Sequence, residues 1–127
     1  MSASNDLQKA IYTALTGAGL TVFDYVPDNE DGFPYVTIGE DTLVDWDTKV
    51  INGFNTTLMI HTWSRGVGRK ECKEIQGTIY GTLHNQTLPM DDHTMFLMRR
   101  ESSLTTLDPD GVTRHGVCTY RILMSEN

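Results

Sequence analysis

Two periods of hydrophobic residues divide the chain into predicted helices and strands. Near the N-terminus, apolar residues recur at three- and four-residue intervals, at Leu7, Ala10, Ile11, Ala14 and Leu15. This spacing places them on one face of an amphipathic helix. Ser4 or Asn5 can cap the start of this helix, and Gly17 and Gly19 favour its end.

Two predicted strands follow in the first half of the chain. Segments 34–39 and 56–63 are rich in β-branched and aromatic residues, which suit a pleated and half-buried surface. A shorter strand-like run, 21–26, is broken by Pro27 and the acidic segment 28–32. We expect this run to form a short edge strand that leads into an acidic turn.

Segment 40–53 separates the two strands and concentrates carboxylates around a single tryptophan. Since it is longer than a tight turn requires, we expect a long loop, and loops of this size in a compact domain usually have a function. Trp46 in such a charged loop either packs back onto its own domain or is kept for a partner. Large aromatic side chains dominate interface energetics, which makes the second alternative worth testing.

A second helix is predicted after the strand at 56–63. Its apolar positions, again at helical spacing, are Cys72, Ile75, Ile79 and Leu83, and its opposite side carries Lys70, Glu74, Gly77 and Gly81. Gly77 and Gly81 each cost about 1 kcal/mol relative to alanine in a helix interior. Two explanations stay open: a tolerated loss of helix propensity, and the close approach of another subunit to a flat helix face.

The C-terminal part predicts a hairpin of two long strands. After a polar connector at 85–94, the apolar run 95–98 begins the first strand, and Asp-Pro-Asp-Gly at 108–111 is a strong turn signal. The return strand alternates, with an apolar face that consists of Cys118, Tyr120, Ile122 and Met124. Thr119 and Arg121 face the other side, which we expect to be exposed.

The order of the elements predicts the fold class. A helix, a short strand, two strands, a second helix and a closing hairpin favour an α+β two-layer sandwich, in which a mainly antiparallel sheet carries two helices on one face. A parallel βαβ architecture is disfavoured because hairpins join consecutive strands. With 127 residues, we expect a single domain that spans 1–127.

Charge and composition argue against several classes of protein. The chain has a formal net charge of -7 and a pI near 4.8, so it lacks the basic surface of a protein that grips nucleic-acid phosphates or an anionic membrane. Neither a signal peptide nor a bilayer-spanning stretch is indicated, and we expect folding in a reducing cytoplasm. Cys72 and Cys118 have no CxxC or CxxH companion, so we expect buried free thiols.

The sequence contains no motif for catalysis or cofactor binding. It has no nucleophile elbow, P-loop, dinucleotide fingerprint or HExxH sequence, and its four histidines lie in separate elements without ligand spacing. We therefore expect no catalytic residue, no cofactor and no metal site. The densest carboxylate group can in principle bind a hard divalent cation, although a solvated acidic loop accounts for it as well; it consists of Glu40, Asp41, Asp45 and Asp47.

A set of short motifs along nearly the whole chain resembles one protein family. Besides the first helix and the acidic loop, the motifs are Val22-Phe-Asp-Tyr-Val-Pro27, Phe33-Pro-Tyr-Val-Thr-Ile-Gly39, Ile60-His-Thr-Trp-Ser-Arg65, the helix after Gly68-Arg-Lys70, Asp108-Pro-Asp-Gly-Val-Thr-Arg-His115 and Tyr120-Arg-Ile122. Together they resemble the small tail-completion or tail-terminator proteins of long-tailed bacteriophages and gene-transfer particles.

The resemblance implies a non-enzymatic virion protein that forms a hexameric ring on the end of the tail tube. In that family the ring ends tube polymerisation and presents the surface joined to the head, so the implied partners are the tail tube protein and a head-completion (connector) protein. DNA is implied to pass through without specific binding, and negative charge facing the lumen is compatible with this because it repels phosphates. Assembly in the host cytoplasm, a place at the neck and no membrane contact are also implied.

Two groups of residues form our hypothesis for the subunit interface. The first lies in the acidic loop and consists of Glu40, Asp41, Asp45, Trp46 and Asp47, with the tryptophan as the buried anchor. The second lies in and before the second helix and consists of Arg65, Arg69, Lys70, Gly77 and Gly81. The acids would line the channel or pair with the basic groups of a partner.

The sequence leaves three other functions open. Within the same architecture, the chain would serve as a head-to-tail connector or a minor tail subunit of the neck. A small metal-dependent enzyme that uses the acidic loop 40–47 would show an activity abolished by a chelator. A monomeric binding module would sediment as a single chain.

Overall fold

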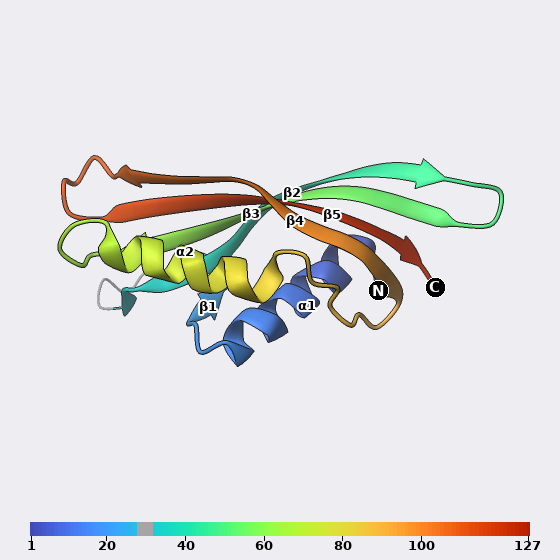
Figure 1. Cartoon of the computed structure of the whole chain (residues 1–127), viewed down its shortest axis with the longest axis horizontal. Coiled ribbons are helices and arrows are strands. Elements are labelled where there is room, and N and C mark those ends of the chain that lie inside the picture. Colours follow the sequence, from blue (N-terminus) through green and yellow to red (C-terminus); the bar gives the residue numbers. More distant parts are fainter. Residues whose placement is uncertain (28–31) are drawn as a thin grey trace.

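The chain folds into two layers, described by a computed structural model that covers residues 1–27 and 32–127 (Figure 1). Its elements in chain order are α1 (Ala3–Gly17), β1 (Val22–Phe23), β2 (Tyr35–Asp47), β3 (Asn52–Ser64), α2 (Lys70–Leu83), β4 (His93–Leu107) and β5 (Arg114–Glu126). The predicted acidic turn at 28–32 falls, except for its last residue, outside the described part. Within the described part of the chain, neither helix is long and apolar enough to cross a membrane.

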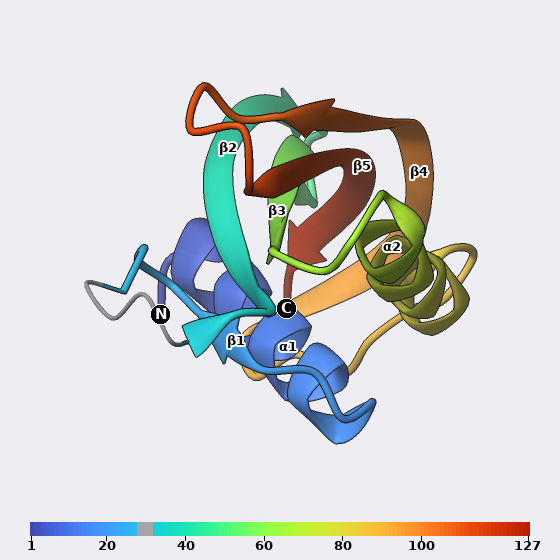
Figure 2. The ribbon, with the colours of Figure 1, turned by 90° about the vertical axis from the view of Figure 1, so that its left-hand side faces the viewer.

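The first layer is a five-stranded sheet in the order β1-β2-β3-β5-β4. The four long strands pair antiparallel, and the two-residue strand β1 pairs parallel with β2. The second layer consists of α1 and α2, which both lie on one face of the sheet (Figure 1). Seen end on, the sheet twists and curls over these helices (Figure 2). The predicted α+β two-layer sandwich is confirmed.

The core lies where the apolar stripes of the helices meet the sheet. Helix α1 buries Leu7, Ile11 and Leu15, and α2 buries Ile79 and Leu83, each at most 1% exposed. The sheet contributes Val36, Ile38, Leu58, Ile60, Met95, Met98, Cys118, Tyr120, Ile122 and Met124. Burial of each such large side chain contributes roughly 1.5–3 kcal/mol. The apolar faces that the sequence predicted for the helices and for the strands thus pack against each other in one core.

Helix α2 approaches β5 closely at Gly116. A Cβ atom on Gly116 would collide with the Gln76 amide and lie 2.9 Å from the Cys72 sulfur. The buried Gln76 side chain donates to the Leu104 carbonyl at 3.0 Å and accepts from the Thr105 hydroxyl at 3.1 Å. The apolar stripe predicted for this helix omitted Gln76, whose amide ties α2 to β4.

Segment 40–53 is not a loop, so this sequence-based expectation was wrong. Strand β2 continues through Asp47, and β3 begins at Asn52, which leaves only a short turn at 48–51. Pairing between the two strands runs without interruption from Asp41, opposite Leu58, to the pair Asp47 and Asn52. The predicted loop is therefore the distal half of a long hairpin.

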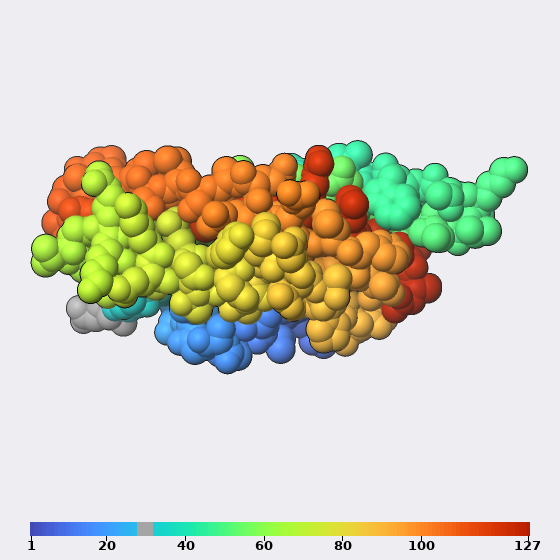
Figure 3. All heavy atoms as spheres, viewed as in Figure 1, coloured from blue at the N-terminus to red at the C-terminus, as the bar shows by residue number. Residues whose placement is uncertain are grey.

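This error has a physical cause. Carboxylates argue against a strand when one of its faces is buried, because an unpaired buried charge is costly. The distal half of the β2–β3 hairpin extends past the helix layer (Figure 3), and nearly all of its side chains from position 40 to 52 are exposed. Because these side chains face water, the carboxylates of this segment can lie in a strand without the penalty of burial.

The closing hairpin of β4 and β5 agrees with the sequence. Gly111 takes the left-handed conformation with φ 74°, and its N–H donates to the Asp108 carbonyl at 3.0 Å. The Asp110 carboxylate accepts hydrogen bonds from the hydroxyl and N–H of Thr113 and from the N–H of Val112. These bonds lower the pKa of Asp110 from its ordinary value to about 2. The Asp110 side chain therefore stabilises this turn through hydrogen bonds to residues of the same turn.

Candidate functional site

The distal part of the β2–β3 hairpin, residues 41–52, projects beyond the helix layer at one end of the molecule, and we name it the β2–β3 arm (Figure 3). Large apolar side chains on this arm are exposed to solvent: Leu43, Val44, Val50 and Ile51. Val50 in the turn is 89% exposed. Apolar side chains gathered on a projecting element make this arm a candidate surface for contact with another protein.

Trp46 packs back onto its own arm. Its indole lies over Gly53 on the neighbouring strand, so close that a Cβ atom there would collide with it. Its ring centroid is 6.4 Å from that of Phe96 in β4. The indole N–H is buried and lacks a hydrogen-bond partner in the described ranges. Of the two sequence-based alternatives, the structure shows packing within the chain, and a partner would meet only the exposed remainder of this side chain.

The four carboxylates of the arm region do not converge. Glu40, at the bulge in β2, forms a hydrogen bond with His61 at 3.0 Å, which lowers the pKa of Glu40. Asp41 accepts from the Ser4 hydroxyl at 2.6 Å, so it ties the base of the arm to α1. Asp45 and Asp47 are exposed, and neither has an ion pair within the described residues.

This dispersal argues against the metal-dependent enzyme considered from the sequence. Across residues 1–27 and 32–127, no group of three or more His, Cys, Asp or Glu side chains is arranged to hold a metal ion. A hard divalent cation needs several oxygen ligands at one point. Glu40 and Asp41 instead form hydrogen bonds with His61 and Ser4. Asp45 and Asp47 share a strand face but stand two positions apart, about 7 Å, so the four carboxylates do not gather around one point.

A groove of about 620 Å³ lies between α2 and β4, and we name it the basic groove. Its lining consists of Arg69, Lys73, Gln76, Gly77, Arg100, Ser103 and Thr105. Arg69 and Lys73 are exposed, and the Arg100 guanidinium lies over the Tyr80 ring at 4.3 Å from its centroid. Three cations thus share one hollow in a chain whose net charge is -7.

Gly77 and Gly81, predicted as a flat helix face, are exposed on α2. Among the residues that the structure describes, nothing lies within 4 Å of the position that a Cβ atom would take at either glycine. Gly77 lines the basic groove, so one member of the predicted glycine face and one predicted cation, Arg69, meet at the same surface. The structure thus leaves open space above this part of the helix.

The other two predicted interface cations are engaged within the chain. Arg65 lies over the Phe33 ring at 4.3 Å, donates to the Thr113 hydroxyl at 3.1 Å and pairs with Asp110 at 3.8 Å. Lys70 pairs with Glu74 at 3.8 Å along α2. These contacts hold Arg65 against the closing hairpin, away from the basic groove.

Sequence analysis missed an aromatic stack on the outer face of the sheet, opposite the helices. His61 and His115 share a hydrogen bond of 2.7 Å, and the Trp63 ring stacks on His115 with centroids 3.9 Å apart. Burial, and then the neighbouring His61, lower the pKa of His115. The sequence shows that His61 and Trp63 are two positions apart, so they share a strand face. It does not show that His115 lies opposite Trp63, because this register is set by the pairing of β3 with β5.

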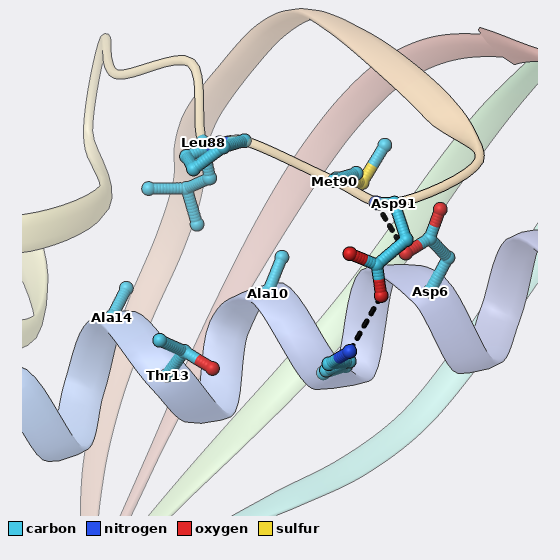
Figure 4. A pocket seen from close by; sticks show the side chains of 9 residues that line it. Asp6, Ala10, Thr13, Ala14, Leu88, Met90 and Asp91 are labelled. Carbon is cyan, nitrogen blue, oxygen red and sulfur yellow. Dashed lines mark hydrogen bonds and ion pairs between the residues drawn. The ribbon is translucent and has the colours of Figure 1, made fainter. Parts of the chain in front are cut away.

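A second network joins α1 to the connector before β4. The Asp6 carboxylate accepts from the N–H group of Asp91 (Figure 4). It also accepts from the N–H group of Asp92 and contacts His93 Nδ1 at 2.7 Å. Burial opposes its ionisation, yet the His93 and backbone hydrogen bonds outweigh it and lower the pKa of Asp6. Beside this network, a hollow of about 400 Å³ is lined mainly by aliphatic side chains and by the Lys9–Asp91 ion pair. The network serves structure, since it anchors the connector.

Comparisons with known proteins point in one direction. The family described as tail completion protein gp17 matches residues 7–125. The tail completion protein gp17 of Bacillus phage SPP1 is 30% identical over 101 residues, which cover 80% of this chain and 75% of that protein. A chain in the solved virion of a native gene transfer agent particle superposes with a TM-score of 0.86 at 18% identity and 98% coverage of both chains, a likeness of fold.

Proposed function

The chain belongs to the tail completion protein gp17 family, and on that premise we propose that it forms a hexameric ring that caps the tail tube. As a member it is a non-enzymatic structural component of the virion tail. The proposed ring ends polymerisation of the tube and provides the surface that joins the tail to the head through a connector protein. Residues 1–127 act in it as one domain at the neck, after assembly in the host cytoplasm.

One structural observation supports a ring in particular. The chain presents two unlike surfaces, the β2–β3 arm and the basic groove. The turn of the arm and the N-terminal end of α2, which contributes to the groove, lie toward opposite ends of the long axis (Figure 1). A closed cyclic assembly needs two different patches on each subunit, because each copy contacts one neighbour with the first patch and the other neighbour with the second. A symmetric dimer would need only one self-complementary patch.

The net charge is compatible with passage of DNA without binding. The chain has a net charge of -7, and negative charge that faces a lumen repels phosphates. Six copies bring this charge together around one channel. In the proposed ring DNA passes without being held, and the partners that bind are proteins: the tube subunits on one side and the head connector on the other.

Imaging of the purified protein with and without tail tubes tests the proposal. We expect a six-fold ring on one end of each tube, and tubes of uncontrolled length when the protein is left out of the assembly reaction. Monomers only, measured by native mass spectrometry and imaging even with tubes present, would overturn it. Density at another level of the neck would instead identify a connector or a minor tail subunit.

A further inference from the structure

We propose that the ring contact is formed when the β2–β3 arm of one copy enters the basic groove of the next copy. This inference rests on the proposed ring and names the two surfaces that make it. It brings together exposed acids on the arm, exposed cations in the groove and the open space above Gly77. The occupant of the groove is therefore a second copy of this chain.

The groove contributes cations that lack an acid of their own. Among the described residues, no carboxylate lies within ion-pair distance of Arg69, Lys73 or Arg100. In an acidic chain, with 17 Asp and Glu against 10 Lys and Arg, three cations in a groove whose lining has no acid are unexpected. Like charges that share a hollow repel one another, so an anionic partner would relieve a cost that the isolated subunit bears.

The arm contributes acids that likewise have no ion-pair partner among the described residues. Asp45 and Asp47 stand two positions apart on one strand, so their side chains share a face and are separated by about 7 Å. Between positions 40 and 53 Lys49 is the one cation in the sequence. Glu40 and Asp41 already have partners in the chain, which leaves Asp45 and Asp47 available to a neighbour.

Shape and direction agree with this pairing. The turn of the β2–β3 arm and the N-terminal end of α2, which carries Arg69, lie toward opposite ends of the molecule (Figure 1). Head-to-tail contact between such ends is heterologous and can close into a ring. Gly77 keeps part of the groove free of side chains, because no other side chain of residues 1–27 and 32–127 lies within 4 Å of the position that its Cβ atom would take. The exposed apolar tip of the arm adds buried area once the acids have set the register.

Charge reversal in full-length chains tests the contact. The arm-reversed chain carries Asp45→Lys with Asp47→Lys, and the groove-reversed chain carries Arg69→Glu with Lys73→Glu. Juxtaposed like charges cost several kcal/mol at an interface, so each chain alone should need a concentration about a hundredfold higher for ring assembly, with or without tail tubes. Circular dichroism and thermal melting establish that each variant folds.

Mixing the two reversed chains distinguishes this contact from other arrangements. In an equimolar mixture, the lysines of the reversed arm meet the glutamates of the reversed groove, and the native arm meets the native groove. An alternating ring of the two chains should therefore re-form, and native mass spectrometry should show three copies of each in a hexamer. A matched control, Arg99→Glu with Arg121→Glu, makes the same change of charge on two exposed arginines paired across β4 and β5, away from the groove.

The outcomes separate this inference from the proposed function. Rings from both reversed chains at the parent's concentration would overturn the arm-in-groove contact and leave the ring intact as a proposal. Failure of the mixture to restore rings, with both chains folded, would also overturn it. Rings that persist in the groove-reversed chain but lose affinity for DNA would assign the groove to nucleic acid. A parent chain that never forms rings, even on tubes, would overturn the proposed function itself.

Discussion

His93 and Asp6 meet at 2.7 Å in a pair whose side chains are 3% and 1% exposed. The contact joins the start of β4 to the first turn of α1 across 87 positions of sequence. Two backbone N–H groups of the connector complete the carboxylate's hydrogen bonds. A buried acid that is satisfied in this way holds the N-terminal helix on the sheet, and its loss should therefore be costly.

Asp6→Ala should lower the free energy of unfolding by about 3 to 5 kcal/mol, because it leaves the buried His93 ring without its partner and removes the acceptor of two backbone N–H groups. Urea denaturation of the two chains measures the difference. The matched control is Asp91→Ala, which removes the exposed ion pair with Lys9 and should cost at most about 1 kcal/mol. Equal losses of unfolding free energy in the two variants would show that the buried Asp6 network stabilises the fold no more than an exposed ion pair does.

Acid should weaken the fold through the same carboxylate. The pKa of Asp6 in the folded chain lies below its ordinary value of 3.8, so the unfolded chain takes up the proton first as the pH falls. The stabilisation from Asp6 is therefore present above pH 3.8, and it is lost as the pH falls from 3.8 through the lower pKa of the folded chain. Unfolding free energies measured at stepwise lower pH should fall more steeply in the parent than in Asp6→Asn. Parallel pH profiles would contradict this assignment.

Two glycine-to-alanine variants should change stability in opposite directions. Gly116→Ala places a methyl group against Gln76 and Cys72 and should cost about 1 to 3 kcal/mol through overpacking. Gly77→Ala meets open space in a helix interior and should stabilise the subunit by up to about 1 kcal/mol. Thermal melting compares the two. A neutral Gly116→Ala would mean that α2 shifts freely on the sheet.

Gly77→Leu should leave the isolated subunit folded and prevent ring assembly, since the larger side chain fills the space in the basic groove. Circular dichroism reports on the fold, and native mass spectrometry with tail tubes reports on the ring. The Gly77→Ala variant serves as the control with the smaller side chain. Normal rings from Gly77→Leu would leave tolerated propensity loss as the explanation for this glycine.

Trp46→Ala should loosen the β2–β3 arm without unfolding the core. Its indole packs on Gly53 and near Phe96, so its removal should speed amide hydrogen exchange in the arm on the order of tenfold, or ~1.4 kcal/mol of local stability. Exchange at buried core positions such as Ile60 should stay unchanged and provides the internal control. Ring assembly should weaken as well, because a frayed arm docks at a higher entropic cost. Unchanged exchange throughout the arm would refute the packing role.

The elements that the sequence predicted are those whose signals are local. The stripe through Leu7, Ile11 and Leu15 needs only helical spacing, and Asp-Pro-Asp-Gly at 108–111 needs only the conformational preferences of its own residues. Alternation from Cys118 to Met124 likewise showed which face of β5 is buried. Since these patterns also fit together as helices over one sheet face, the α+β sandwich followed from sequence.

Tertiary structure decided what depends on neighbours distant in the chain. Segment 40–53 forms strands because β3 pairs with it beyond the helices, where exposed carboxylates carry no burial penalty. The Asp6–His93 pair, the stack of His61 with His115 and the basic groove around Arg100 each join residues from different elements. Composition and period report how a residue suits its own helix or strand. They do not report register or distance between elements, which are set by packing the whole core at once.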